Sequence, residues 1–336
     1  MTVTPMDLAD DALMSQMYAV VVAVRCFERP HFVPAPEAAA VADLRHIDPG
    51  ESTHLWGMWE EGTLAGVLTA WLPLHDNVDT VWTQVDIHPD HRRRGHGTRA
   101  IAALVDFARE NTRSRVVAEA HCPADRADDH PYRVFAERNG FRLGQTQIIR
   151  RLMLPVDDDL LAEIAQEARA AYQGRYRVEA FGEVPRDLWP SLCACMNRLG
   201  SDAPTGEIDW EPESLTPERY EGFLDLDRQT GRVRLTAVAI DEDSGEVVAY
   251  SELALPPGNS RADQWGTLVL TEHRGHRLGQ AVKVANLLAL QANHPDRVDV
   301  ITGNAHDNPW MVSINERLGF LPLELCPAFY RTLDTP

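Results

Sequence analysis

Apolar residues fall into the same order of runs in the two halves of the chain. In each half, two β-rich runs flank a short turn that contains glycine, at residues 60–62 and 243–246. Apolar runs bounded by such turns predict strands, and each pair predicts a β-hairpin. The four predicted strands are residues 54–59, 64–71, 234–240 and 247–255.

The pattern downstream of each hairpin is also repeated. A third β-rich run leads into a glycine-containing loop, a helical pattern, a further strand and a second helix that ends in Gly-Phe. The loop arginine lies 49 residues before this phenylalanine in the first half (Arg92 and Phe141) and 46 residues before it in the second (Arg274 and Phe320). The predicted strands are residues 81–87, 115–120, 267–270 and 298–302, and the predicted helices after the loops are residues 98–110 and 280–292.

This internal repeat predicts two copies of one α/β unit. The length of 336 residues agrees, because it exceeds twice the usual size of about 150 residues per domain. The Pro-Val-Asp-Asp-Asp stretch at 155–159 closes the first copy and opens a predicted helix at 160–172, with acidic residues in its first turn. We therefore expect two domains, residues 1–155 and 156–336.

The loop between strand and helix is the clearest candidate for binding chemistry. The first loop reads R-x-x-G-x-G with Arg92, Gly95 and Gly97, and the second contains Arg274 and Gly279. Backbone N–H groups at a helix start bind anions, and glycines let a pyrophosphate approach the main chain. Ordinary tight turns use the same glycines, but recurrence before a helix in both halves favours a phosphate-binding loop.

The charge of the chain restricts its partners. The sequence has 32 Lys and Arg against 51 Asp and Glu, a net charge of −19, and such a surface repels phosphate backbones. The apolar run at 18–24 is too short to span a bilayer, and acidic residues stand where a secretory signal carries cations. We expect a cytoplasmic monomer or homodimer with no nucleic-acid and no membrane partner.

Cysteines and histidines do not predict a metal site. The five cysteines are irregularly spaced and are not paired with histidines at zinc-ligand intervals, so we expect buried thiols. Three histidines of the first loop, His88, His91 and His96, lie close in sequence, but three adjacent arginines would oppose a divalent cation. We therefore expect no metal.

On these residues the chain resembles the GNAT superfamily of acyl-CoA-dependent N-acetyltransferases. That family has the loop Q/R-x-x-G-x-G/A between its fourth strand and third helix, and a later helix of the pattern N-x-x-A-x-x-x-Y-x-x-x-G-F. Arg92, Gly95 and Gly97 match the loop, whereas in the second copy Arg277 replaces the first glycine. The resemblance covers nearly the whole chain as two copies, and is similar to mycothiol synthase-like tandem GNAT proteins of bacteria.

The resemblance implies the fold and the cofactor. Each half is expected to be an α/β (α+β) unit, with a mixed, mostly antiparallel sheet flanked by helices. The fourth and fifth strands are expected to splay apart around acetyl-CoA, the acetyl donor. The coenzyme-binding residues that the resemblance implies are Val85, Ile87, Arg92, Arg93, Arg94, Gly95, His96, Gly97 and Thr98 in the first copy, and Leu268, Val269, Arg274, Gly275, His276, Arg277, Leu278, Gly279, Asn304 and Asn308 in the second.

The implied reaction is direct attack of an amine on the acetyl carbonyl, which a backbone N–H of the fourth strand polarises. A carboxylate or an ordered water must take a proton from the amine. The family tyrosine that protonates the departing thiolate is replaced by Ala136 and Asn315, and Asp129 stands at the family asparagine of the first copy. Protonation therefore comes from elsewhere, such as water or Tyr330, or a copy is catalytically silent.

Side chains favour the second copy as the catalytic one. Glu252 lies in an otherwise apolar predicted strand, and Asp263 leads into the next strand, so both are candidate bases. The alternative is that strand alternation points Glu252 to solvent. In the first copy, alternation can place Asp86 of the fourth strand on either face. Asn304 and Asn308 fit amide contacts to coenzyme, with helix capping as the alternative.

These expectations lead to two function hypotheses. The first is an N-acetyltransferase that moves an acetyl group from acetyl-CoA to a primary amine of a small molecule, and the acidic chain favours a cationic acceptor. The second is a tandem GNAT module that binds acyl-CoA without turnover, which the missing tyrosine favours. Release of free thiol across a panel of amines separates them.

Overall fold

Both hairpins form where the sequence predicts them. The computed structural model describes residues 2–126, 128–202, 206–305 and 307–334. In the first half β2 (Glu51–Glu60) pairs antiparallel with β3 (Thr63–Pro73), and in the second β8 (Val233–Asp241) pairs antiparallel with β9 (Val247–Leu255). The hairpin predictions are confirmed, with strands a few residues longer than expected.

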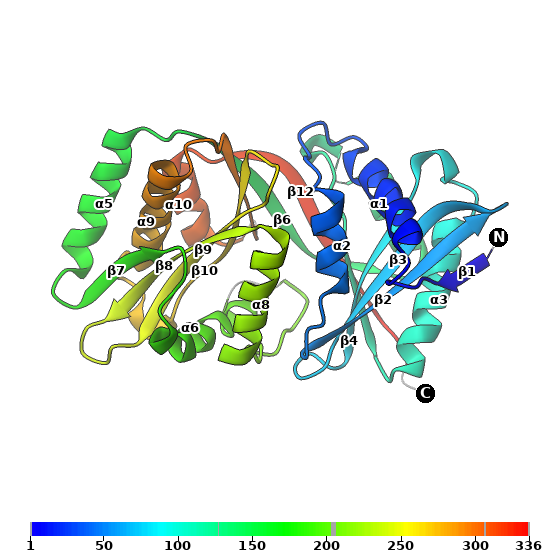
Figure 1. Cartoon of the computed structure of the whole chain (residues 1–336), viewed down its shortest axis with the longest axis horizontal. Coiled ribbons are helices and arrows are strands. Elements are labelled where there is room, and N and C mark those ends of the chain that lie inside the picture. The colour runs from blue at the N-terminus through cyan, green and yellow to red at the C-terminus, as the bar shows by residue number, and fades with distance from the viewer. Residues whose placement is uncertain (1, 127, 203–205, 306, 335–336) are drawn as a thin grey trace. The chain divides into compact units, whose positions relative to one another are not determined.

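The chain divides into two compact units (Figure 1). The first contains Met1–Thr146, Gly206–Ile208 and Glu324–Pro336, and the second contains Gln147–Thr205 and Asp209–Leu323. The first continuous segment therefore ends nine residues before the boundary expected at 155/156, and each unit also takes residues from the other half of the sequence. The division of the sequence into domains 1–155 and 156–336 stays a prediction.

The first unit is a sheet covered by helices on both faces. Its strands run in the order β1-β2-β3-β4-β5-β12; β4 and β5 are parallel and the other pairs are antiparallel. Its further elements are β1 (Thr2–Pro5), α1 (Asp11–Cys26), α2 (Glu37–Arg45), β4 (Thr80–Ile87), the 3₁₀ turn η1 (Pro89–His91), α3 (His96–Glu110), β5 (Arg115–Glu119), η2 (Ala124–Arg126), α4 (Pro131–Arg138) and β12 (Leu321–Thr332).

Two apolar clusters hold these layers together. Helices α1 and α2 pack on one face of the sheet through Met14, Met17 and Val41. Helices α3 and α4 pack on the other face, where Leu104 and Phe329 are among the buried residues. The Asp10 carboxylate caps α1 by accepting hydrogen bonds from the N–H groups of Ala12 and Leu13. Strand β4, which these helices cover, carries several residues of the site described below.

The second unit repeats this arrangement. Its strands run in the order β6-β11-β10-β9-β8-β7, with β10 and β11 parallel. Helices α5, α9 and α10 contribute to one apolar cluster, and α6 and α8 to another. Its further elements are β6 (Arg142–Met153), α5 (Asp158–Tyr172), β7 (Tyr176–Phe181), η3 (Arg186–Leu188), α6 (Trp189–Met196), α7 (Leu199–Asp202), α8 (Pro217–Thr230), β10 (Arg261–Val269), η4 (Thr271–His273), α9 (Leu278–Asn293), β11 (Asp299–Ala305) and α10 (Pro309–Leu318).

The last strand of each half completes the sheet of the opposite unit. Strand β6 pairs with β11 through Gln147–Met153, and β12 pairs with β5 through Ala328–Thr332. Sequence patterning predicts neither pairing, because apolar strands of similar composition could each pair with several others. Of the five cysteines, four are buried and Cys26 is exposed, so the expectation of buried thiols holds for all but one. Among the described residues, the helices are too short or too polar to cross a membrane.

Candidate functional site

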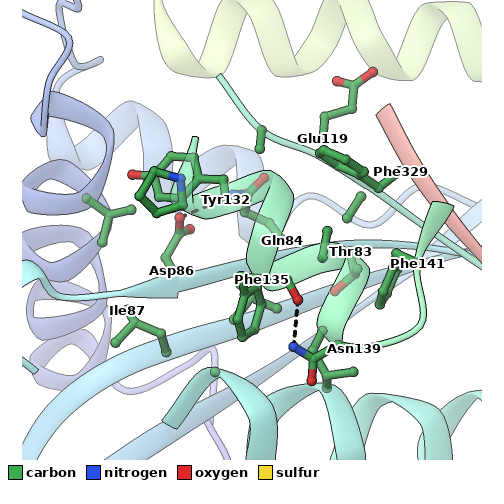
Figure 2. A pocket seen from close by; sticks show the side chains of 18 of the residues that line it. Thr83, Gln84, Asp86, Ile87, Glu119, Tyr132, Phe135, Asn139, Phe141 and Phe329 are labelled. Carbon is green, nitrogen blue, oxygen red and sulfur yellow. Dashed lines mark hydrogen bonds between the residues drawn. The ribbon is translucent and has the colours of Figure 1, made fainter. Parts of the chain in front are cut away.

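The fourth and fifth strands of the first unit separate at a cavity. They pair only between Thr80–Thr83 and Arg115–Ala118. Beyond that point β4 continues to Ile87 with a strand partner on its β3 side alone, in the part of the chain that the structure describes. A cavity of about 1090 Å³ lies here (Figure 2). The sequence-predicted coenzyme residues that line it are Val85, Ile87, Arg92, Arg93, Gly95, His96, Gly97 and Thr98.

The loop after β4 is held in a shape that presents the start of α3. Arg92 Nε donates to the Ile87 carbonyl oxygen at 3.1 Å, and its Nη2 donates to the Tyr132 hydroxyl at 3.2 Å. Gly95 has φ +87°, a conformation that glycine adopts freely, directly before the helix. The first turn of α3 carries no acidic side chain, and the first N–H groups of a helix have no intrahelical acceptor. This helix start can bind an anion.

Gly97 lines the cavity and also allows close packing of α4. A Cβ at this position would lie 2.8 Å from the Phe135 ring, so the glycine allows α4 to pack against the start of α3. Gly95 is the position with open space, since a Cβ built there meets none of the described atoms within 4 Å. The space beside Gly95 is therefore open to a ligand.

Asp86 is a buried carboxylate in this cavity. It lies on β4 with 2 % of its surface exposed, and its Oδ1 accepts a hydrogen bond from Gln84 Nε2 at 3.3 Å. Burial raises the pKa of Asp86, against the opposing effects of Arg25, Gln84 and Arg92. A carboxylate with a raised pKa in a cavity is a candidate general base.

A second carboxylate lines the cavity from β5. Glu119 lies at the end of that strand, and burial raises its pKa, although the nearby His121 and the Cys326 thiol act to lower it. Asp86 and Glu119 thus come from the two strands that separate, as Figure 2 shows. The cavity offers a carboxylate on each side.

An ion-pair cluster fixes the cavity wall on the β12 side. Glu324 is buried and contacts Arg29 at 2.6 Å and His121 at 2.9 Å, both of which line the cavity, and His31 at 3.1 Å. Burial alone would raise the pKa of Glu324, but hydrogen bonds from His121 and Arg29 outweigh it and lower the pKa to about 2. Glu324 is therefore an ionised carboxylate that holds three basic side chains.

A tyrosine hydroxyl, that of Tyr132, lies in α4 close to the position of the missing family tyrosine. It lies in the first turn of α4, one turn before Ala136, and lines the cavity together with Asp86 (Figure 2). Its hydroxyl accepts from Arg92, and its ring packs on His130 at 4.5 Å between centroids. Tyr330, the alternative acid considered from the sequence, instead donates to Glu207 at 3.1 Å.

The loop of the second unit has the same backbone shape but different contacts. Arg274 Nε donates to the Val269 carbonyl oxygen at 3.2 Å, as Arg92 does to Ile87. Arg277 occupies the position of Gly95 with φ +56° and donates to Glu167 at 2.6 Å. The guanidinium of Arg277 is thus paired with a carboxylate of α5, and with Arg317 it lowers the pKa of Glu167 to about 2.

Glu252 is buried and paired with an arginine. It is 5 % exposed on β9, and its Oε1 accepts from Arg234 at 2.8 Å, while Arg234 also donates to Asp227 at 2.7 Å. The alternative of a solvent-facing Glu252 is wrong, because the side chain is buried. Asp263 lies on β10, and burial raises its pKa. The ion pair makes Glu252 a poor candidate for a base, and the preference for the second unit loses its main support.

Other positions of the second unit are occupied by protein contacts. Asn308 caps α10 by accepting from the N–H of Met311, and Asn304 Oδ1 accepts from Arg150 and Asn315. Counted from the loop arginines, Leu268 stands at the position of Asp86, and Lys283 at the position of the cavity-lining Ile101. The remaining predicted residues, Val269, Gly275, His276, Leu278 and Gly279, lie along the β10 end, the loop and the start of α9.

Sequence reasoning missed several cavity residues. Glu119, like Glu252, is a carboxylate in an otherwise apolar β-rich run, and the same pattern points to it. Tyr132 lies four residues before the family position, so a search at that position alone does not find it. Arg25 and Arg29 lie on or just after α1, a helix that the sequence patterning left unassigned, so nothing connected them to the site.

Comparison with known proteins agrees with this architecture. Residues 21–141 match the model of the acetyltransferase (GNAT) family. A tandem GNAT protein from the clavulanic acid biosynthesis pathway is 22 % identical with a TM-score of 0.78, and the match covers 98 % of both chains. A GCN5-related N-acetyltransferase from Sphaerobacter thermophilus is 13 % identical with a TM-score of 0.64, over 98 % of this chain and 95 % of that one. No curated protein matches the chain by sequence.

These findings fit the geometry of both units. Each unit has a mixed, mostly antiparallel sheet with helices on both faces and a parallel strand pair that ends early, followed by the loop and helix. The structural likeness covers both units, and the family match falls on the unit that contains the cavity. The chain therefore has the fold of a tandem GNAT protein, and residues 21–141, in its first unit, match the model of the acetyltransferase (GNAT) family.

Proposed function

We propose that the first unit is an N-acetyltransferase that moves an acetyl group from acetyl-CoA to a primary amine of a small molecule. The observation that carries the proposal is the cavity at the separation of β4 and β5, which has an anion-binding helix start at one side and carboxylates within it. The second unit has Leu268 and Lys283 at corresponding positions, which favours the first unit as the site of reaction.

In this proposal the coenzyme follows elements that the first unit presents. The pyrophosphate lies on the N–H groups at the start of α3, beside Gly95 and Arg93. The pantetheine lies along the unpaired edge of β4 from Gln84 to Ile87, where a backbone N–H polarises the acetyl carbonyl. This arrangement needs no metal ion.

The cavity side chains supply the proton transfers of the proposed reaction. Asp86 takes a proton as the amine nitrogen attacks, the new C–N bond forms and the C–S bond breaks. The thiolate then takes a proton from Tyr132, whose hydroxyl Arg92 orients, and water restores that proton. Asp86 and Glu119, together with the net charge of −19, favour an amine with positive charge.

Acetyl transfer to a panel of small amines tests this function. Free thiol release with acetyl-CoA is measured for cationic, neutral and anionic primary amines, and coenzyme binding is measured separately by calorimetry. Turnover with a cationic amine supports the proposal. Tight coenzyme binding without thiol release for any amine class would favour a module that binds acyl-CoA without turnover.

We also propose a cytoplasmic location and assembly as a monomer or homodimer. Free cysteines in the structure fit a reducing compartment. Light scattering on the purified chain reports its assembly, and fractionation of expressing cells reports its location.

A further inference from the structure

A cluster of three possible metal ligands lies at the loop of the first unit. Glu60 at the end of β2, His91 in η1 and His96 at the start of α3 bring one carboxylate oxygen and two ring nitrogens within 4.8 Å of one another. Glu60 Oε2 lies 2.8 Å from His91 Nδ1 and 3.6 Å from His96 Nε2. Ligand atoms on one tetrahedral zinc ion are about 3.4 Å apart, so small side-chain shifts would bring all three to one ion.

His96 gives independent support for a ligand at this place. It is 1 % exposed, and among the described residues its ring nitrogens make no hydrogen bond of ordinary length; the Nε2 contact with Glu60 is long, at 3.6 Å. A buried imidazole without partners is costly, and such groups in native proteins are commonly satisfied by water or an ion. Its Nε2 faces Glu60, toward the centre of the cluster.

The second unit shows that the fold does not require a histidine here. Counted from the loop arginines, its residue at the position of His96 is Leu278, which is buried at the start of α9. That unit keeps a histidine at the position of His91, His273, whose Nδ1 lies 3.7 Å from Asp241 and 2.9 Å from the Tyr176 hydroxyl. The second unit thus also pairs a histidine with a carboxylate, but it has no counterpart of His96.

We propose that Glu60, His91 and His96 form a site for a divalent cation of the zinc type. Two imidazoles and one carboxylate are a ligand set that suits Zn²⁺ and leaves a position for water. The ion would join the end of β2 to η1 and to the first residue of α3.

The arginines of the loop do not exclude this ion, although the sequence suggested that they would. Arg92 is held at Ile87 and Tyr132, away from the cluster. Arg94 does compete, because its Nη1 donates to Glu60 Oε2 at 2.9 Å, but its side chain is 53 % exposed. It can leave Glu60 for water at small cost when an ion arrives.

Titration calorimetry of the full chain, freed of metal by a chelator, tests the site with Zn²⁺ alone. We expect equimolar binding, and Co²⁺ in its place should give the visible absorption of a tetrahedral ion. His96→Leu, which copies the second unit, should lower zinc affinity by more than about 100-fold, since even loss of an outer-sphere partner costs 10–100-fold. His91→Ala should do the same, and Arg94→Gln should raise the affinity.

His273→Ala is the matched control, because it removes the corresponding histidine of the second unit. It should leave zinc affinity unchanged, and circular dichroism establishes that each variant is folded. Absence of equimolar zinc binding by the unmodified chain would overturn the proposal. Equal affinity in folded His96→Leu or His91→Ala would overturn it as well, since the ion would then lie elsewhere.

Discussion

Gln84 donates a hydrogen bond from Nε2 to Oδ1 of Asp86 across 3.3 Å, along the strand edge that faces the cavity. Residues two apart in a strand share a face, so β4 itself brings the amide to the carboxylate. The amide fixes the orientation of Asp86, while burial raises the pKa of that carboxyl. This pairing is the basis of the first prediction.

Asp86→Asn should lower the rate of acetyl transfer by roughly 100-fold or more, because it removes the base and keeps the size of the side chain. Coenzyme affinity should change little. In the unmodified protein the rate should rise with pH as Asp86 loses its proton, at a pH above the usual range for aspartate because the pKa is raised. Steady-state kinetics across pH, with calorimetry for the coenzyme, checks both.

Glu119→Gln and Glu252→Gln are the parallel variants. Full activity in Asp86→Asn with loss in Glu119→Gln would move the base to β5. If only Glu252→Gln lost acetyl transfer activity while remaining folded, the reaction would take place in the second unit.

Gly95→Asp should weaken coenzyme binding at least tenfold. Aspartate tolerates the left-handed conformation and stabilises a helix start, so the protein should stay folded. Its carboxylate would occupy the N–H groups that we propose for the pyrophosphate and repel phosphate charge. Calorimetry with coenzyme A measures the change.

Gly95→Asn is the neutral control of equal size and should lose much less affinity. Arg277→Asp makes the corresponding change in the second unit. Equal binding by Gly95→Asp and the unmodified chain would mean that the pyrophosphate lies elsewhere, and a loss confined to Arg277→Asp would place it in the second unit.

Glu324→Gln should destabilise the protein at neutral pH by about 3 kcal/mol, because the folded pKa of about 2 lies below the unfolded value of 4.5. A depressed carboxyl pKa stabilises the fold above the unfolded pKa, and that stabilisation is lost as pH falls through about 2. The difference between variant and unmodified protein in urea unfolding should therefore shrink between pH 5 and pH 2.

Glu137→Gln serves as its control, since this exposed carboxylate pairs with Arg133 four residues away on α4. Its effect should stay below about 0.5 kcal/mol. Equal effects of the two substitutions would show that the Glu324 cluster adds no special stability.

Lys283→Ile should stabilise the protein below pH 7. Lys283 is the single lysine of the sequence, is 1 % exposed, and burial lowers its pKa from 10.5 to about 7. Between pH 7 and pH 10.5 the unfolded chain binds more protons than the folded protein. The free energy of unfolding of the unmodified protein should therefore rise by on the order of 4 kcal/mol over this range. The variant, which carries the residue of the first unit at that position, should lack this gain.

The pKa of Lys283 can be measured directly. Because the chain has one lysine, a ¹³Cε-lysine label gives one resonance, and its titration in the folded protein reads the pKa. A midpoint near 10.5 would contradict the assignment of Lys283 as a buried, weakly solvated amine.

Local patterning predicted the elements well because hairpins and loop-helix junctions depend on neighbouring residues. The two hairpins, the loops with Arg92 and Arg274 and the helices after them all lie within a few residues of their predicted ranges. These features follow from alternation, turn residues and helix starts, which are local properties of the sequence.

Longer-range features could not be predicted in the same way. Glu252 and Asp86 are both carboxylates in β-rich runs, and their different surroundings are decided by Arg234 on the neighbouring strand and by Arg25 on α1. The cluster of Glu60 with His91 and His96 joins residues more than 30 positions apart. Spacing along the chain carries no information about such contacts until the sheet register is known.

The strand that completes the sheet of the first unit follows β5 by more than 200 positions in the sequence. Residues Ala328–Thr332 of β12 pair with β5, so this edge of β5 stays open during synthesis until those residues have been made. An open strand edge invites pairing with other chains. A fragment that stops near residue 155 should therefore aggregate or need chaperones, and removal of the last dozen residues should damage the first unit rather than the second.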